Sequence, residues 1–579
     1  MPLKINFKGF TIIYPGVYTN IDVSRLENII SGVSGILALI GSARDGISKE
    51  PVIFTDIFEA INHYGSGDLV DALYIASNSF ANPPTPPPQV IICYRTNPVQ
   101  RASFTIQSIR GINILKIYSR YWNLKGNQDW FNLSKDTNTN TFTLNAKGKE
   151  GLITKTFGNW FLKITNITSD KIIHIKIEKR TTGKYFVVEI IDQNTNNIEQ
   201  TFEFEIFEGY LIQNLINDLG VISAIQVEPN LSELGFETIN LDLVDININP
   251  NESYIFSAYG YELKEALQNV FDVEVLSDFE EPQEYQTTFL QGAVENFPST
   301  QDIIDGINAI KNLPATQIAI CDSNKTSFQG WVSVLLSQLN ENNSAKGRNE
   351  RQAYLGVDVE TKEEAIQISS SLQSPYIVLF IQKGIWNIAG RNKELPPWAF
   401  GVACASMKAS APLGKPLTFK YPRVVSIDDK LFGKPINENI DLITKGICLV
   451  DKVEKGIRII RGNTTYFLTQ NDALISEEVV QIFLAIKKSI RENLEDRFIG
   501  EIFTNPIDLI TNAIQSILDS FVGMGVLVPT TDEQGNPLPP YRNLQVKREG
   551  DTISWSVEAT TNMGINFIVG DVILTKLKG

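Results

Sequence analysis

The sequence predicts a protein of several domains, with α/β and α+β segments and an all-β insertion. Three observations lead to this prediction. Short buried strands alternate with helices in the middle of the chain, a long stretch before them has the two-residue periodicity of β-sheets, and two amphipathic helices lie in the last quarter. The chain has 579 residues, which is enough for two to four domains with buried cores.

The first hundred residues contain an arm and the start of an α/β domain. Residues 1–27 are predicted to be an extended N-terminal arm, because Pro15 and Gly16 mark a turn and the apolar residues are too few for a core. Residues 28–100 are predicted to be the first part of the α/β domain. Its β-α-β order is read from the segments SGILALIGSARDG, VIFTDIFEAINHYG and VIICYR.

Residues 101–248 are predicted to be an inserted β-rich domain. Apolar and polar residues alternate in TFTLNA, KIIHIKIEK, YFVVEII and TFEFEIF, and clusters of Asn, Thr, Asp and Gly separate these runs. Residues 249–420 then alternate helix and strand, with the strands TQIAIC, AYLGVDV and YIVLFIQ. This order predicts the second part of the α/β domain, with a largely parallel sheet and helices on its faces.

Residues 421–550 are predicted to be a C-terminal α+β domain with two amphipathic helices. Ser476 is a suitable N-cap for the first helix, and Asn505, Pro506 and Gly523 indicate the start and end of the second. The first helix also carries a small basic face made of Lys487, Lys488 and Arg491. This face is either an ordinary solvated surface or a docking surface for an acidic partner.

Residues 551–579 are predicted to be C-terminal strands and a second arm. TISWSVEA alternates cleanly, and INFIVGDVILTKL is another strand-like run that needs a partner sheet. Strand addition to a neighbouring subunit would satisfy the backbone groups of both arms. The predicted inter-subunit strands are Thr11–Val23 and Ile565–Lys576, with the residues Thr11, Ile13, Val17, Tyr18, Ile21, Val23, Ile565, Phe567, Val569, Val572 and Leu574.

Charge and hydropathy argue against several classes of partner. The net charge of −15 disfavours nucleic acid as the main partner, because phosphate binding needs clustered Lys and Arg. The N-terminus lacks the apolar region of a signal peptide, and no stretch reaches about 18 apolar residues, so synthesis in the cytoplasm without membrane insertion is expected.

The residues needed for common catalytic and metal sites are also sparse. The only histidines are His63 and His174, so a Ser-His-Asp or Cys-His pair cannot be built within residues 249–420. No phosphate-binding loop motif occurs. The four cysteines are far apart and form no C-x-x-C pair. We therefore expect no enzymatic activity, no cofactor and no metal.

Several motifs resemble those of contractile bacteriophage tail sheath proteins. YPGVYTNIDVS at 14–24 resembles the P-G-V-Y opening of that family, and a strand of the type GILALIGSARDG follows it, as in the family. GIRIIRGNTTY is similar to a family segment that ends in a G-x-T-like turn. RENLEDRFIGEIFTNPIDLITNAIQSILDSFVGMG at 491–525 resembles the family's C-terminal helix pair, and VGDVILTKL occupies the place of its closing strand.

The resemblance implies a structural subunit that polymerises helically around a tail tube and contracts to drive the tube through the host envelope. It implies a subtilisin-like central segment without proteolysis, a C-terminal domain facing the tube, and an inserted domain projecting outward. Lys487, Lys488 and Arg491 would be candidates for contact with the tube. The implied partners are further copies of the chain, the tail tube protein, and the baseplate and tail terminator proteins. The implied location is the tail of a virion made in a bacterial cytoplasm.

Three other interpretations remain open. The first is the sheath of a tailocin or of an extracellular contractile injection system; type VI sheaths resemble a pair of shorter chains instead. The second is an α/β hydrolase-like enzyme built on the central segment, against which the absence of histidine after residue 174 argues. The third is a surface adhesin built on the β-rich domain.

Overall fold

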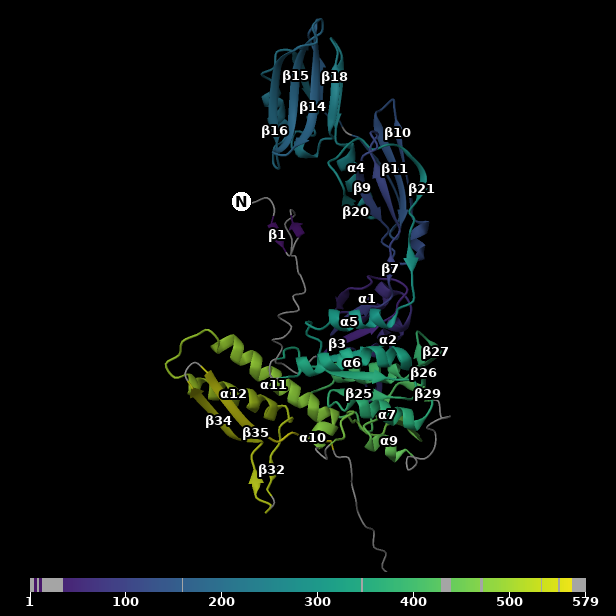
Figure 1. Ribbon diagram of the computed structural model, residues 1–579, viewed down its shortest axis with the longest axis vertical. Helices are drawn as coiled ribbons and strands as arrows, with labels where there is room; N and C mark the ends of the chain where they lie inside the picture. Colours follow the sequence, from purple (N-terminus) through teal and green to yellow (C-terminus); the bar gives the residue numbers. More distant parts are fainter. Residues whose placement is uncertain are drawn as a thin grey trace, which may run out of the picture. The chain divides into compact units, whose positions relative to one another are not determined.

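A computed structural model describes residues 5–7, 10–12, 35–158, 160–344, 347–427, 439–468, 472–532, 534–549 and 552–564 (Figure 1). The chain divides into two compact units. Unit 1 comprises Met1–Pro98 and Phe297–Gly579, and unit 2 comprises Val99–Asn296, so the second unit is an insertion in the sequence of the first.

The centre of unit 1 is a six-stranded sheet of order β25-β24-β23-β3-β6-β4. Five neighbouring strands are parallel, and β4 is antiparallel to β6. All residues of the five parallel strands are buried, which explains their continuous apolar runs. The predicted parallel sheet is confirmed. The strands are β3 (Ile36–Gly41), β4 (Pro51–Phe54), β6 (Val90–Arg95), β23 (Gln317–Ile320), β24 (Gln352–Gly356) and β25 (Ile377–Phe380).

Helices cover both faces of this sheet. Leu37 and Leu39 of β3 point into one core with α1, α2 and α8, whereas Ile36 and Ala38 point into the other with α5, α6 and α7. The sheet with these six helices is called the α/β body below. The helices are α1 (Ile57–Tyr64), α2 (Asp68–Ser77), α5 (Thr300–Ala309), α6 (Lys325–Asn342), α7 (Lys362–Leu372) and α8 (Trp398–Ser410).

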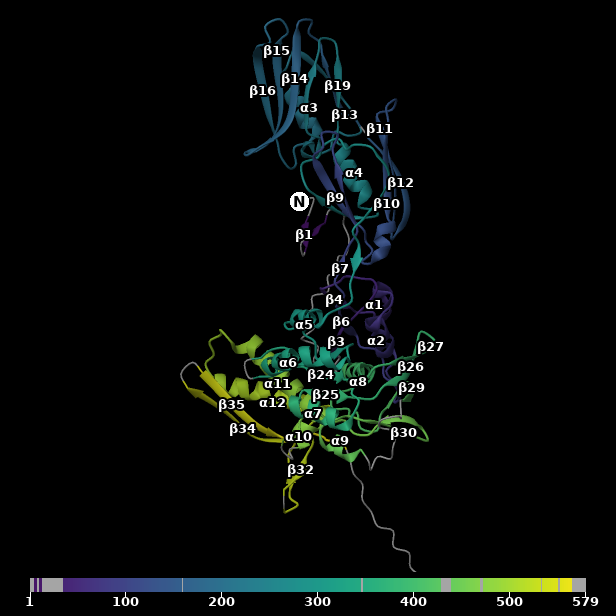
Figure 2. The ribbon, with the colours of Figure 1, turned by 45° about the vertical axis from the view of Figure 1, so that its right-hand side comes forward.

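The contact of α8 with the sheet is unusually close, and Figure 2 shows α8 beside β24. A Cβ added at Gly401 would lie 2.6 Å from the carbonyl oxygen of Tyr354. A Cβ added at Gly356 would lie 2.1 Å from the backbone of Pro397. Glycine at both positions therefore lets the helix pack directly on the strand backbone.

Smaller elements of unit 1 surround the α/β body. β27-β26-β29 form a three-stranded sheet, and β5 pairs with β28 and β30 with β31. These elements are β5 (Phe80–Asn82), β26 (Gly384–Ile388), β27 (Arg391–Leu395), β28 (Tyr421–Pro422), β29 (Val424–Ile427), α9 (Ile440–Thr444), β30 (Val450–Val453), β31 (Gly456–Ile459) and α10 (Asp472–Ile475).

The C-terminal module of unit 1 consists of α11 (Glu477–Phe498), α12 (Pro506–Gly523) and the hairpin of β34 (Tyr541–Glu549) and β35 (Thr552–Ala559). Both views show the two helices side by side next to the hairpin (Figures 1 and 2). The module has its own apolar core, which includes Ile482 and Ile514. Short strands β32 (Thr530–Thr531) and β33 (Pro537–Leu538) pair within the connection from α12 to β34.

The two predicted helix starts are confirmed, but the predicted capping bonds are not found. Ser476 and Asn505 occupy the N-cap positions of α11 and α12, and neither side chain accepts a capping hydrogen bond. The Asn505 amide instead donates to the carboxylate of Asp508.

Unit 2 contains two β cores. The first joins the sheets β20-β9-β8 and β12-β11-β10-β21 with α4, and the second joins β16-β15-β14-β18 and β17-β13-β19 with α3. β7 pairs with β22. The elements are β7 (Val99–Gln100), β8 (Ser103–Gln107), β9 (Asn113–Tyr118), η2 (Leu124–Gln128), β10 (Trp130–Asp136), β11 (Thr141–Gly148), β12 (Gly151–Phe157), β13 (Trp160–Asn166), β14 (Lys171–Arg180), β15 (Gly183–Asp192), β16 (Ile198–Ile206), α3 (Ile212–Leu219), β17 (Ile225–Pro229), η3 (Thr238–Asn240), β18 (Val244–Ile248), β19 (Ser253–Ser257), α4 (Tyr259–Leu267), β20 (Asp272–Val275), β21 (Tyr285–Phe289) and β22 (Val294–Glu295).

The end of the insertion differs from the predicted boundary at residue 248. β19 pairs with β13, β20 with β9 and β21 with β10, so residues 249–296 belong to unit 2 and not to the α/β domain. A side chain also bridges the predicted boundary: Asp242 accepts hydrogen bonds from the backbone N–H groups of Tyr259 (2.9 Å) and Gly260 (3.1 Å) at the start of α4. Local periodicity cannot reveal such long-range pairing.

Candidate functional site

The predicted N-terminal arm lies mostly outside the described residues. β1 (Ile5–Phe7) and β2 (Phe10–Ile12) form a short antiparallel hairpin in which Thr11 is opposite Asn6. Thr11 therefore has a backbone partner in its own chain. The other predicted inter-subunit residues lie outside the described part of the chain: Ile13, Val17, Tyr18, Ile21, Val23, Ile565, Phe567, Val569, Val572 and Leu574. Their pairing with neighbours stays a prediction.

The C-terminal hairpin has edges that a strand from another chain could extend. Within the described residues, β34 and β35 pair only with each other. Val546 and Ile553 pack on the core of the C-terminal module, which fixes one face of the hairpin against the helices. Each strand therefore has a row of backbone N–H and C=O groups without a strand partner in this part of the chain, the usual template for strand addition.

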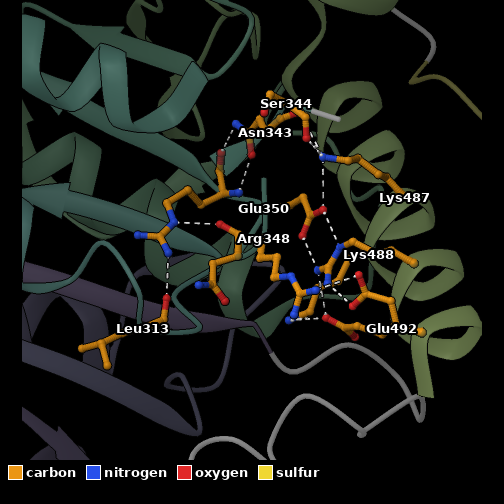
Figure 3. A network of polar contacts seen from close by, with 12 residues as sticks. Leu313, Asn343, Ser344, Arg348, Glu350, Lys487, Lys488 and Glu492 are labelled. Atoms are coloured by element: carbon orange, nitrogen blue, oxygen red, sulfur yellow. Dashed lines mark hydrogen bonds and ion pairs between the residues drawn. The ribbon is translucent and has the colours of Figure 1, made fainter. Parts of the chain in front are cut away.

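The predicted basic face on α11 is engaged with a buried carboxylate of unit 1 (Figure 3). The Lys487 ammonium lies 3.2 Å from Glu350 Oε1 and donates to the carbonyl oxygens of Asn343 (3.1 Å) and Ser344 (2.5 Å). The Arg491 guanidinium lies 3.0 Å from Glu350 Oε2. The Glu350 side chain is 1% exposed, so Lys487 and Arg491 neutralise a charge that is out of contact with water.

Further acidic residues surround the same cations. Lys488 lies 3.7 Å from Glu492, one turn further along α11, and Arg491 lies 3.3 Å from Glu492 and 3.4 Å from Glu495. Burial lowers the pKa of Arg491, but its hydrogen bond to Glu350 and the neighbouring carboxylates outweigh this effect and raise it above its ordinary value. The three cations are thus largely neutralised within the chain, and their contact with a tube stays a prediction.

Arg351 and Asn343 hold the loop that carries Glu350. The Arg351 guanidinium donates to the carbonyl oxygens of Ile310, Lys311 and Leu313 after α5. The Asn343 side chain accepts from the Arg351 backbone N–H (2.9 Å) and donates to the Arg351 carbonyl oxygen (2.8 Å). The Glu350 carboxylate is therefore presented to α11 from a fixed position on the α/β body.

A second charged cluster lies at the start of α11. The Lys408 ammonium of α8 is 2.9 Å from Glu477 Oε2, with side chains that are 1% and 0% exposed. Lys408 also donates to the Lys415 carbonyl oxygen, and Glu477 Oε1 accepts from the Leu417 backbone N–H. The sequence predicted the helix start at Ser476 but not the partners Glu350 and Lys408, because nothing in the local pattern points to residues so distant along the chain.

The histidines and cysteines lie in structural surroundings. The Ile47 backbone N–H donates to His63 Nε2 (3.0 Å), and the His174 ring nitrogens lie 2.8 Å from Glu189 and 2.7 Å from Asp245. Burial raises the pKa of all four thiols, those of Cys93, Cys321, Cys404 and Cys448. In the described part of the chain, no cluster of three His, Cys, Asp or Glu side chains could hold a metal ion.

None of the helices in the described ranges combines the length and the apolar character needed to cross a bilayer.

Comparison with known proteins connects these features to one group. No family model matches the chain. The chain is similar to the tail sheath protein of Bacillus phage SP01, with 26% identity over 527 residues that cover 86% of each chain. The predicted resemblance to phage tail sheath proteins is confirmed. A second sheath relative, from Staphylococcus phage Twort, is 23% identical over 580 residues and 93% of each chain.

The fold is also similar to that of a solved sheath protein. The sheath tail protein from Listeria innocua has a TM-score of 0.50 at 13% identity, covering 94% of this chain and 99% of that chain. The similarity to the sheath relatives therefore extends over both units.

Proposed function

We propose that this protein is the structural subunit of a contractile tail sheath, which polymerises helically around a tail tube and contracts to drive the tube through the host envelope. The observation that carries this proposal is the similarity to the SP01 tail sheath protein over 86% of both chains. The similarity therefore covers far more of the chain than one shared domain.

The terminal arms are the proposed links between subunits. Thr11–Val23 and Ile565–Lys576 would add strands to sheets of neighbouring copies, and the open edges of β34 and β35 support this proposal. Strand addition suits a contracting assembly, because rigid units can then dock differently while the backbone ladders stay intact.

The remaining features of the function are proposed from the same resemblance. The α/β body corresponds to the subtilisin-like segment of sheath proteins and acts without enzymatic activity. The C-terminal module faces the tail tube protein, with Lys487, Lys488 and Arg491 near that contact, and the inserted unit points away from the tube. The ends of the sheath contact the baseplate and tail terminator proteins, in the tail of a virion made in the bacterial cytoplasm.

Electron microscopy of the purified, concentrated protein tests the proposal. We expect long, striated, hollow tubes, because sheath subunits can polymerise without the tube. Deletion of residues 1–27 or 565–579 should leave a folded monomer that forms no tubes, while the matched control Thr154→Ala on the exposed strand β12 should polymerise normally. Compact monomers at every protein and salt concentration would contradict the function, and tubes from both deletion variants would contradict the role of the arms.

The main alternative is the sheath of a tailocin or an extracellular contractile injection system. The subunit chemistry would be the same in these machines, so the genes beside this one distinguish them. Neighbouring capsid and terminase genes would support a phage, and their absence from a complete tail gene cluster would support the alternative.

A further inference from the structure

The chain after β35 returns to the start of α11 before the described residues end. The Thr560 backbone N–H donates to the Pro540 carbonyl oxygen (2.9 Å), and the Asn562 backbone N–H donates to the Val526 carbonyl oxygen (2.8 Å). The next contact is that of Gly564 with the Glu478 carboxylate, whose pKa is lowered by the approach of the Gly564 backbone N–H. The root of the C-terminal segment, defined here as residues 560–564, is thus tied to the module at several points.

Gly564 lies in a narrow seat between Pro416 and Glu478. A Cβ added at Gly564 would lie 3.2 and 3.3 Å from ring carbons of Pro416 and 3.5 Å from Glu478 Oε1. Because these distances leave little room for a side chain, the seat suits a backbone segment that approaches the carboxylate directly.

Glu478 is an unusual group to find in this position. Glu478 is 1% exposed, and its Oε2 atom has no hydrogen-bond partner in the described part of the chain. The charged and titratable groups around it are Glu477, Lys408 and Tyr354. Lys408 forms its ion pair with Glu477, and among the described residues no other cation forms an ion pair with Glu478.

The energetics of this site favour a role other than stabilising the fold. Burial and, after it, the charge of Glu477 raise the pKa of Glu478 to about 7, while its own backbone N–H, the charge of Lys408 and the N–H of Gly564 act in the opposite direction. Keeping a buried carboxyl group with an unsatisfied oxygen destabilises a protein. Beyond its own helix, the charge of Lys408 and the backbone N–H of Gly564 are the contacts that favour the ionised form of Glu478.

We propose that Glu478 is a positioning residue that fixes the root of the C-terminal segment, residues 560–564, against the start of α11. The link to assembly rests on the proposed function, which assigns these residues to contacts with neighbouring subunits. A fixed root limits the positions that the segment can sample before it meets a neighbour, which lowers the entropy lost on docking.

The strength of the anchor depends on the protonation of Glu478. An ionised carboxylate accepts a hydrogen bond more strongly than a neutral carboxyl group does. The root should therefore be held more firmly above pH 7 than below it. A glutamine at this position keeps the accepting oxygen and loses the pH dependence.

Hydrogen exchange of residues 560–564 in the monomeric fraction of the full-length protein tests the proposal. Glu478→Ala should speed exchange there roughly tenfold, the factor expected for loss of one hydrogen bond. Glu478→Gln should restore protection and make it independent of pH between 5.5 and 8.5, after correction for intrinsic exchange. The matched control Glu492→Gln, in the middle of α11, should leave exchange at the root unchanged.

Gly564→Ala tests the seat without altering the buried charges. It should speed exchange at residues 560–564, because the added Cβ presses on Pro416, while the melting temperature of the α/β body stays unchanged. Unchanged exchange at the root in both Glu478→Ala and Gly564→Ala would overturn the proposal, as would an equal effect of Glu492→Gln.

Electron microscopy of the same variants separates the anchor from the proposed function. Faster exchange together with fewer or irregular tubes supports both. Faster exchange with normal tubes supports the role of Glu478 in fixing the root, but it contradicts the role of residues 565–579 in assembly.

Discussion

Two carboxylate centres attach α11 to the α/β body, and they differ in their contact with water. At the start of the helix, Glu477 and Lys408 are 0% and 1% exposed. Near the middle, Glu350 is equally buried, but its partners Lys487 and Arg491 are 30% and 17% exposed. The first centre is dry on both sides of the ion pair, whereas the second has a dry anion and partly hydrated cations.

This difference determines what happens when a partner is removed. In the dry centre, the remaining charge has neither a counter-ion nor water, and the full desolvation penalty appears in stability. In the second centre, a freed lysine or arginine can move its charge into solvent. The two centres therefore fix the same helix with different sensitivity to mutation, pH and salt.

The largest expected effect is that of Lys408→Met. This change leaves Glu477 as an uncompensated buried charge and should lower the free energy of unfolding by about 3–5 kcal/mol, measured by urea denaturation at pH 8. Lys488→Met, on the same side of α11 as the partly hydrated centre, serves as the control. Similar losses for the two variants would remove the distinction between the centres.

The pH dependence of Glu478 should be the next largest effect. Because its folded pKa of about 7 lies above the ordinary value of 4.5, the folded state binds this proton more tightly than the unfolded state. The associated stability is present below about pH 4.5 and is lost as the pH rises through 7. Wild-type protein should thus lose of the order of 2 kcal/mol more than Glu478→Gln between pH 4.5 and 8, in denaturation measured across that range. Parallel stability curves for the two proteins would contradict the assignment.

Glu350→Gln should have a smaller effect of about 1–2 kcal/mol. Its amide oxygen can still accept from Arg491, and both cations can take up water. The loss should shrink when denaturation is repeated in 1 M salt, because screening acts on the partly exposed cations. A salt-independent loss of 4 kcal/mol or more would mean that this centre is as dry as the first.

The smallest effect on stability is expected for Lys488→Glu. Within the described residues, the ion pair of Lys488 is the 3.7 Å contact with Glu492, which is worth a few tenths of a kcal/mol at most. The variant therefore tests the tube contact with little disturbance of the fold. If the basic face touches the tube, assembly on purified tubes should fall at low salt. An unchanged yield would reject that contact.

The fold was predictable where short-range patterns reflect it. Local patterns predicted the buried strands β3 and β6, which the structure contains. They also predicted α12, whose start and end are marked by Asn505, Pro506 and the glycine at its last position. The end of the inserted unit was not predictable in this way. It depends on β19, β20 and β21 pairing with strands far earlier in the chain, and such pairing is decided by the complementarity of whole sheets.

The candidate sites also combine features that were predictable from the sequence with features that were not. The residue types alone identified Lys487, Lys488 and Arg491 as one basic face, because residues three and four apart share a side of a helix. They could not reveal that Glu350, on a loop fixed by Arg351, occupies most of that face. The arms were predicted from apolar runs without a core, and their pairing with neighbouring copies stays a prediction, because most of their residues lie outside the described part of the chain.

The sequence by itself determined the buried strands of the parallel sheet, the starts of α11 and α12, the resemblance to tail sheath proteins and the scarcity of catalytic side chains. Tertiary structure decided which charges are paired, which are dry and where the C-terminal segment begins. The physical reason is that periodicity and capping act over a few residues, whereas the energy of a charge depends on the surrounding dielectric. That environment exists only after α8, α11 and the loop of Glu350, distant in sequence, have packed together.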